Sequence, residues 1–291
     1  MPLLRPLRRR LTDVLLVFLS ASAHGSVRAL PNWLALRVGA LGGRLARHLL
    51  RADARRAAIQ LRQLPTDRRP SVSAVFQHLG MCAAEACVLP RQALRLERWV
   101  RVEGEELLTE RMASDRGTVW VSGHTGNWEL PAALAAARGV PIHVIAAPIH
   151  YPNLDRWVNR LRGRHGMRVL RANRAGLRRA LEVLRAGGHV GLLIDQRLPG
   201  RSVEMPFLGA PARTTTAAAR LARAAGVPAV LVTATRERPG RHLIRLGPRL
   251  TVDDRAGERD ATARLSRGLE DVIRSRPEQW VWMHDRWEAK T

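Results

Sequence analysis

A histidine, an asparagine and a glutamate follow a short apolar run in the stretch "VSGHTGNWEL", residues 121–130. His124 and Glu129 lie five positions apart, with glycines at positions 123 and 126. A carboxylate that accepts a hydrogen bond from one imidazole nitrogen fixes the tautomer and raises the basicity of the other nitrogen. These residue types suit general base catalysis, in which His124 takes a proton from a hydroxyl group.

The spacing of the pair places a condition on the local fold. On a continuous helix, side chains five positions apart point about 140° away from each other, so His124 and Glu129 would not meet. They meet only if His124 lies in a turn and Glu129 lies in the first turn of the next helix. Gly123 and Gly126 permit such a turn, and Pro131 is tolerated near a helix start. An ordinary loop histidine followed by a helix-starting glutamate explains the same letters, so the pair alone leaves both interpretations open.

The elements that must position this motif are short apolar runs that alternate with amphipathic stretches. Residues 51–100 are predicted to be helical, and the alternation begins at residue 117. The predicted strands are "GTVWVSG", "PIHVIAAP", "MRVL", "HVGLLID", "PAVLVTATR" and "HLIRLGPRL", with helices between them that end on glycine. This pattern predicts an α/β fold with a mixed, mainly parallel sheet flanked by helices. The reactive residues are then expected at the carboxyl ends of strands, where His124 lies.

The first 60 residues differ from the rest of the chain in charge. They carry 11 basic and 2 acidic side chains, whereas residues 251–291 carry 8 basic and 9 acidic ones. A basic cluster (Arg5, Arg8, Arg9 and Arg10) precedes an apolar run at 14–19, which is too short to span a bilayer as a helix. Residues 31–50 are again apolar, with arginines at intervals. Two apolar-basic helices lying on an anionic membrane surface are the preferred interpretation, and two core helices are the alternative.

A secretory signal peptide is a further interpretation of the N-terminus, because "ASA" at 21–23 follows the basic and apolar segments. Asp13 at the start of the apolar segment and the continuing pattern beyond it favour retention of the segment. We therefore expect no cleavage after Ala23. The expected organisation is a membrane-associating helical segment over residues 1–60 and a catalytic domain over residues 61–291.

The composition narrows the classes of function. The formal charge is +24, and 48 of the 49 basic residues are arginine. Aromatic residues make up only 4% of the chain, and no nucleic-acid-binding signature occurs, so a nucleic-acid partner is not expected. Cys82 and Cys87 provide neither a disulfide framework nor the spacing of a metal site. The charge instead suits phosphorylated lipids, an acidic carrier protein and an anionic bilayer.

Four stretches resemble one known family in the same order along the chain. "HTGNWE" resembles the His-x4-acid signature of the bacterial lipid A biosynthesis acyltransferases, the lauroyl/myristoyl transferases of the glycerolipid acyltransferase type. The other three stretches are "LDRWVNRLRGRHGMRVL", "IDQRLPGRSVEMPFLGAPARTTTAAARLARAAGVPAV" and "RPEQWVWMHDRWE". The related phosphatidylinositol mannoside acyltransferases share the layout, although the Asp195-Gln196 pair looks closer to the lipid A branch.

The resemblance implies transfer of a fatty acyl chain from acyl carrier protein or coenzyme A to a hydroxyl of a membrane glycolipid, a lipid A precursor in lipopolysaccharide biosynthesis. Acylation of a phosphatidylinositol mannoside or another phospholipid is the alternative. The resemblance also implies that no metal or redox cofactor is needed and that the protein lies on the cytoplasmic face of the cell inner membrane. His124 would be the general base and Glu129 would orient it. An acid is also implied at Asp195, and the division of labour between the two carboxylates stays open.

The resemblance also suggests residues that bind the substrate. Arg162 matches the family arginine that precedes a glycine by four positions, although Arg160 and Arg164 leave the register open and a solvated helix face is the alternative. We include Arg164 and Asn127 in the candidate binding set, with Asn127 also suited to shape the turn. Alternation at 280, 282 and 284 predicts a strand whose tryptophans, with His284 and Arg286, pack in the core.

Overall fold

The computed structural model describes residues 4–65, 69–197 and 200–287 of the 291-residue chain. The side chains of the basic cluster Arg5, Arg8, Arg9 and Arg10 lie outside what it describes. Its α-helices are α1 (Leu4–Ala29), α2 (Asn32–Leu49), α3 (Arg51–Leu61), α4 (Val72–Gln92), α5 (Glu105–Ala113), α6 (Leu130–Ala137), α7 (Pro152–Arg164), α8 (Arg174–Arg185), α9 (Ala217–Ala225) and α10 (Arg255–Ser275). Two short 3₁₀ helices are η1 (Ala93–Arg98) and η2 (Pro277–Gln279).

One seven-stranded sheet forms the centre of the molecule, in the order β1-β9-β8-β2-β5-β3-β4. Its strands are β1 (Val100–Glu103), β2 (Thr118–Ser122), β3 (Ile142–Ala146), β4 (Arg168–Arg171), β5 (His189–Leu193), β8 (Ala229–Arg238) and β9 (Arg241–Leu250). Every neighbouring pair is parallel except β8 and β9, which run antiparallel. The prediction of a mixed, mainly parallel sheet is therefore confirmed.

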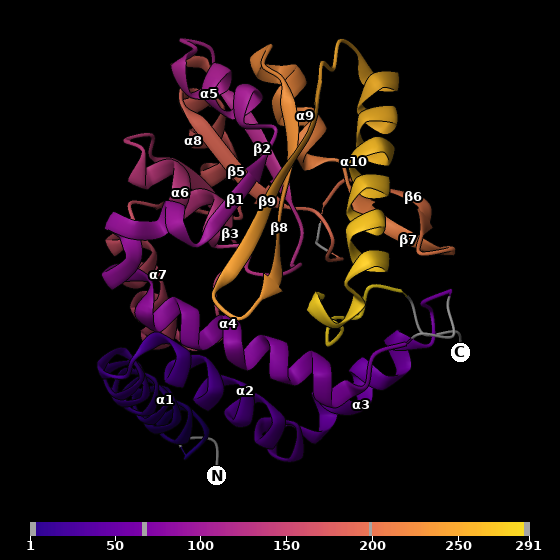
Figure 1. The fold of residues 1–291 in the computed structure, drawn as a ribbon. Helices are drawn as coiled ribbons and strands as arrows, with labels where there is room; N and C mark the ends of the chain where they lie inside the picture. The colour runs from indigo at the N-terminus through magenta and orange to yellow at the C-terminus, as the bar shows by residue number, and fades with distance from the viewer. Residues whose placement is uncertain (1–3, 66–68, 198–199, 288–291) are drawn as a thin grey trace.

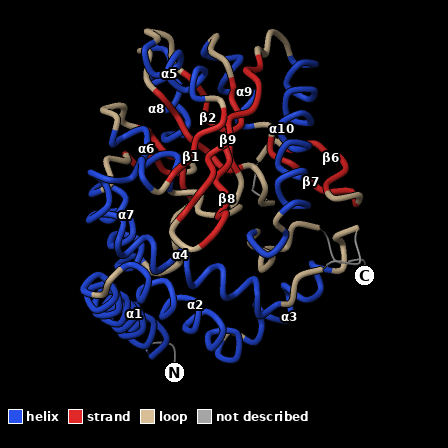
Figure 2. The backbone as a smooth tube through the Cα atoms, in the orientation of Figure 1, coloured by secondary structure: helices blue, strands red, loops and turns tan. Residues whose placement is uncertain are grey.

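Helices cover both faces of the sheet, as the apolar strands require. In β2, all of whose residues are buried, Val119 and Val121 point into one cluster with α8, α9 and α10. Trp120 points to the opposite face, into a cluster with α5 and α6. Figure 1 shows this layered arrangement, and Figure 2 shows the strands crossing between the helices. The predicted glycine ends are confirmed at positions 139, 166, 187 and 226, where φ is positive.

The N-terminal helices pack against the rest of the chain at α4 and α7, below the sheet in Figure 1. Helix α2 lies so close to α4 that a Cβ on Gly80 would come within 2.1 Å of the Gly39 carbonyl oxygen. A Cβ on Gly43 would likewise lie 2.1 Å from the Phe76 carbonyl oxygen. Glycine is therefore required on both helices for this backbone contact. The division at residue 60 into two domains stays a prediction.

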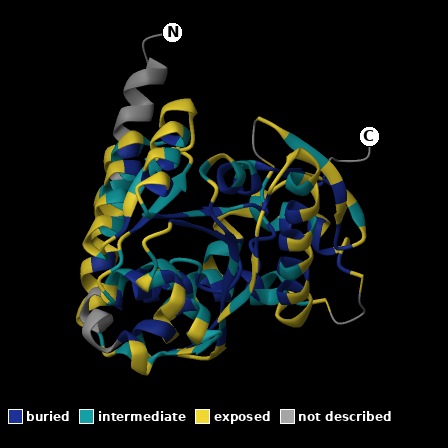
Figure 3. Ribbon diagram, turned by 90° about the horizontal axis from the view of Figure 1, so that it is seen from above, coloured by how far each residue is buried: buried dark blue, intermediate teal, exposed yellow. Residues whose placement is uncertain are grey.

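Large exposed apolar side chains concentrate in this N-terminal layer. Figure 3 shows that the helices nearest the N-terminus carry many exposed residues. They are Val14, Phe18, Leu19, Trp33, Val38, Leu41, Leu45, Leu49, Leu50 and Ile59, and only Ile149 among the described residues adds to them elsewhere. Within the same described residues, one helical window, 72–89 in α4, has the length and composition to cross a bilayer. That window is 44% buried inside the protein and holds the buried polar residues His78 and Glu85, as a core helix does.

Two segments depart from the predicted pattern. The Pro-Phe-x-Gly stretch is part of a hairpin, β6 (Ser202–Phe207) with β7 (Ala210–Thr215), that turns on Leu208 and Gly209 with positive φ. The predicted strand at 280–284 is wrong, because only one isolated bridge, Thr125 to Trp280, forms there.

The chain folds back at the tail, where the indole of Trp282 donates to the carbonyl oxygen of Pro277 at 2.7 Å. The tryptophans still pack as expected, and the rings of Trp280 and Trp282 lie 4.6 Å apart. Arg286 is 1% exposed and lies over the ring of Phe207. The described part of the tail is therefore a packed loop.

Candidate active site

His124 lies just beyond the carboxyl end of β2, in a tight turn that leads to α6. Gly126 has φ +54°, and a Cβ there would lie 1.7 Å from the carbonyl oxygen of Ala234 on β8. Only glycine can occupy this position, because a side chain would collide with the neighbouring strand and strain the backbone. The turn is therefore fixed against the sheet at the position that the sequence predicted.

Asp195 contacts His124 from the neighbouring strand β5. Because β2 and β5 run parallel and adjacent, their carboxyl ends meet at one edge of the sheet. The His124 Nδ1–H donates to Asp195 Oδ1 at 2.9 Å, and the His124 backbone N–H donates to Oδ2 at 2.6 Å. The indole of Trp280 donates to the same Oδ2 at 2.7 Å.

These donors keep the Asp195 carboxylate charged although it is 2% exposed. Burial alone would raise its pKa, but the His124 imidazole and the donated hydrogen bonds lower the pKa to about 2. An ionised carboxylate on Nδ1–H leaves Nε2 as the basic nitrogen of His124. The side-chain nitrogen of Gln196 lies 3.1 Å from Nε2 and 3.2 Å from Nδ1. Since these distances are nearly equal, the Gln196 amide nitrogen contacts both ring nitrogens rather than one of them.

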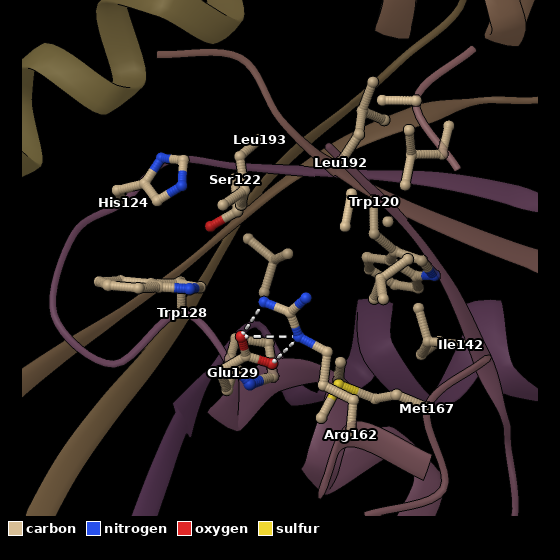
Figure 4. A pocket seen from close by; sticks show the side chains of 18 of the residues that line it. Trp120, Ser122, His124, Trp128, Glu129, Ile142, Arg162, Met167, Leu192 and Leu193 are labelled. Carbon is tan, nitrogen blue, oxygen red and sulfur yellow. Dashed lines mark hydrogen bonds and ion pairs between the residues drawn. The ribbon is translucent and has the colours of Figure 1, made fainter. Parts of the chain in front are cut away.

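Glu129 points away from His124, which corrects the expectation that it orients the imidazole. It immediately precedes the first residue of α6, and its carboxylate faces Arg162 of α7 (Figure 4). The guanidinium donates through Nε at 3.1 Å and through Nη2 at 2.7 Å to Glu129 Oε1. Both side chains are about a quarter exposed. The turn at 126–128 thus directs the Glu129 side chain toward α7. The carboxylate beside His124 is that of Asp195.

The other two candidate binding residues do not reach the site. Arg164 is two positions beyond Arg162 on α7, so it lies on another side of the helix, where it is exposed and close to His24. Asn127 is 5% exposed and donates to Glu85 Oε2 at 2.8 Å. Its side-chain oxygen accepts from the Glu129 backbone N–H at 3.3 Å. Asn127 therefore links the turn after His124 to Glu85 of α4.

A buried polar cluster supports this turn, and local sequence patterns gave no sign of it. Glu85 of α4 accepts two hydrogen bonds from Arg236, at 3.0 and 2.7 Å, and one from His242 at 3.0 Å. Burial would raise the pKa of Glu85, but His242 and Arg236 lower it to about 2. Burial and then Arg236 lower the pKa of His78 to about 3, so its neutral ring donates to the Gly126 carbonyl oxygen at 3.2 Å.

A cavity of about 700 Å³ opens beside His124. Its polar end is lined by Ser122, His124, Trp128, Glu129, Arg162, Gln196 and His284 (Figure 4). Its inner wall is apolar and lies between the sheet and α6, with Trp120, Leu134, Ala135, Ile142, Val232 and Ile244 among its residues. His284, expected in the core, lines the cavity, with its ring 5.6 Å from that of His124.

The arrangement places an imidazole, hydrogen-bonded to a buried carboxylate, at the polar end of a largely apolar cavity. Such a site can hold an alkyl chain while the histidine takes a proton from a hydroxyl at the polar end. Among the described residues, no group of three or more His, Cys, Asp or Glu side chains could hold a metal ion.

The chain is similar to known proteins over nearly its whole length. A family model described as "Bacterial lipid A biosynthesis acyltransferase" matches residues 5–289. A curated protein of Escherichia coli (strain K12), "Lipid A biosynthesis lauroyltransferase", is 30% identical over 281 residues, which cover 90% of this chain and 87% of that protein.

Proposed function

Because the chain belongs to the bacterial lipid A biosynthesis acyltransferase family and is an acyltransferase, we propose that it acylates a hydroxyl of a lipid A precursor in lipopolysaccharide biosynthesis. The donor is an acyl thioester of acyl carrier protein or coenzyme A. The observation that carries the proposal is the hydrogen bond of His124 Nδ1 to Asp195 at the mouth of the apolar cavity.

In the proposed reaction His124 Nε2 takes the proton of the acceptor hydroxyl as its oxygen attacks the thioester carbonyl carbon. The tetrahedral intermediate then expels the thiolate, which takes the proton back from the imidazolium. Asp195 stabilises that imidazolium and holds the ring, as the acid of a catalytic triad does. Positioned proton removal contributes typically about 10²–10⁴-fold to rate. The two steps balance without an oxidant or reductant, so we propose no metal or redox cofactor.

The cavity takes the fatty acyl chain in this proposal. Its inner wall is apolar, and burial of each methylene group contributes about 0.8 kcal/mol. Arg162 stands at the polar end, where its planar guanidinium suits a phosphate of the acceptor or the donor. Glu129 Oε1 accepts two hydrogen bonds from this guanidinium and so fixes its position.

We place the protein on the cytoplasmic face of the inner membrane, where both thioester donors occur. The exposed apolar side chains of α1 and α2, interspersed with arginines, support this location. Trp33 is 60% exposed and lies beneath the guanidinium of Arg37, a pair suited to the lipid headgroup region. Flotation on vesicles tests the proposal: binding to anionic vesicles that is lost with Leu41→Asp is expected, and unchanged flotation contradicts it.

Retention of the N-terminus is part of the same proposal. Asp13 and His24, on either side of the possible cleavage point after Ala23, are both buried against the body of the protein. Cleavage would remove the Asp13 contacts with α7. N-terminal sequencing of protein purified from membranes is expected to find residues before His24. A mature chain that begins at His24 would show that the segment is a signal peptide.

The decisive experiment is mass spectrometry of lipids from cells that contain or lack the protein. We expect one added acyl chain on a lipid A precursor, and loss of this product with His124→Ala at equal protein level. His48→Ala is the matched control, because His48 is an exposed histidine outside the cavity. An acyl chain added instead to a phosphatidylinositol mannoside would assign the other acceptor. An unchanged amount of product with His124→Ala would show that His124 is not the general base.

A further inference from the structure

An acidic side chain in the middle of the first helix is buried against a helix of the catalytic region. Asp13 is only 4% exposed although apolar residues surround it in α1. Its Oδ2 accepts from the backbone N–H and the side-chain amide of Asn153, each at 2.9 Å. Its Oδ1 accepts from the backbone N–H of Leu154 at 3.2 Å. These donors lie 140 and 141 positions further along the chain, in the first turn of α7.

Asp13 supplies the hydrogen-bond acceptors that α7 lacks at its N-terminus. The first N–H groups of an α-helix have no partner inside the helix, and a side-chain oxygen commonly caps them. In α7 the residue at the cap position is Tyr151, which makes no side-chain cap bond, and the first helical residue is Pro152. The carboxylate of Asp13 therefore acts as the cap from another helix, with a charge that suits the helix dipole.

A second contact aligns the two helices. Asp13 and His24 lie eleven positions apart, which is about 20° around a helix, so both project from one side of α1. The His24 ring meets Trp157 of α7 edge to face, with centroids 5.8 Å apart. Burial, followed by Arg28 and Arg164, lowers the pKa of His24, so this ring is neutral. Helix α1 is thus packed along α7 at two points.

Helix α7 is little buried in the part of the chain that the structure describes. Asp155 is its one buried residue, and it accepts from the Ile149 backbone N–H and from Arg171. The far end of α7 carries Arg162, which holds Glu129 at the mouth of the cavity. The position of α7 therefore decides where the Arg162 guanidinium lies, and α1 helps to decide the position of α7.

We infer that Asp13 is a positioning residue for acyl transfer: by capping α7 it holds Arg162 in register with Glu129 at the cavity mouth. The inference rests on the proposed function, since Arg162 matters only if the cavity binds the substrates. Val14, Phe18 and Leu19 lie at least about 100° around α1 from Asp13 and are exposed. One helix therefore presents an apolar side to its surroundings and a capping carboxylate to the catalytic region.

A double-mutant cycle on the full chain in membranes tests this inference. The variants are Asp13→Ala, Arg162→Ala and both together, assayed as initial rates at equal protein level with the acyl thioester and the lipid acceptor. We expect Asp13→Ala to lower kcat/KM by roughly five- to tenfold, the scale of a lost helix cap. In the Arg162→Ala background the same change should alter kcat/KM by less than about twofold, because the guanidinium that Asp13 positions is already absent.

Asp254→Ala is the matched control, because Asp254 caps α10 through the Gly257 N–H at 2.7 Å, and it does not line the cavity. It should lower thermal stability as Asp13→Ala does and leave kcat/KM unchanged. If Asp13→Ala does not accumulate, Asp13→Asn carries the cycle, since it keeps one capping oxygen. Equal losses in both backgrounds, or full activity of Asp13→Ala, overturn the inference. A wild-type protein that acylates no lipid would instead overturn the proposed function.

Discussion

Asp195 binds His124 twice, through the imidazole Nδ1–H at 2.9 Å and through the backbone N–H at 2.6 Å, across 71 positions of sequence. The double contact fixes both the ring and the turn that carries it. Glu129, only five positions from His124, instead binds Arg162. The acid nearest in sequence is therefore not the acid that supports the base.

Substitution of the two acids should separate their roles. Asp195→Asn puts an amide where the imidazole needs a charged acceptor, so we expect kcat to fall by roughly 10²–10⁴-fold. Glu129→Gln keeps the size of the side chain and weakens its contact with Arg162, so we expect mainly a higher KM. Steady-state kinetics in detergent micelles checks both values. If Glu129→Gln loses kcat as severely as Asp195→Asn, the assignment of Asp195 as the supporting acid is wrong.

The buried cluster beneath the turn predicts a pH dependence of stability. The pKa of His78 is about 3 in the folded protein, below the usual 6.5, so the unfolded chain binds the extra proton. This contribution to stability is complete above pH 6.5 and is lost as pH falls toward 3, by up to about 1.4 kcal/mol per pH unit. Thermal unfolding between pH 7 and 5 should therefore show a shallower dependence in His78→Gln. An unchanged slope would mean that this histidine is not held neutral.

The inner wall of the cavity predicts which acyl chains fit. Ala135 lies on α6, is 5% exposed and lines the apolar end. Ala135→Phe fills part of that space, so we expect a preference for shorter acyl chains, with each excluded methylene costing about 0.8 kcal/mol. Competition between thioesters of different length, read by mass spectrometry of the products, measures the shift. An unchanged length preference at normal activity would place the acyl chain elsewhere.

The backbone contact between α2 and α4 predicts a sharp difference between glycines. Gly80→Ala would put a Cβ 2.1 Å from the Gly39 carbonyl oxygen, and separation of the helices should cost about 1–3 kcal/mol. Gly42→Ala, on the partner helix α2, meets nothing within 4 Å and should stabilise the helix by up to about 1 kcal/mol. Melting temperatures of the two variants compare these effects. A neutral Gly80→Ala would show that the helices do not pack this closely.

The sequence alone determined the alternation of strands and helices, the turn at His124 and the family resemblance. Each depends on residues close together in the chain: apolar runs, glycine at helix ends, and the His-Thr-Gly-Asn-Trp-Glu motif. The hairpin at 202–215 and helix α10 were not among the predicted elements, although an aspartate cap, Asp254, begins α10.

The tertiary structure decided which side chains meet. Asp195 reaches His124 because β5 lies beside β2, and Arg236 reaches Glu85 across 151 positions because the end of β8 meets α4. Asp13 caps α7 for the same kind of reason. The pattern of apolar and polar residues in a short segment indicates which residues are buried and where turns occur. The order of the strands and the packing of the helices depend on the whole chain. A carboxylate's partner is therefore fixed only when distant segments come together.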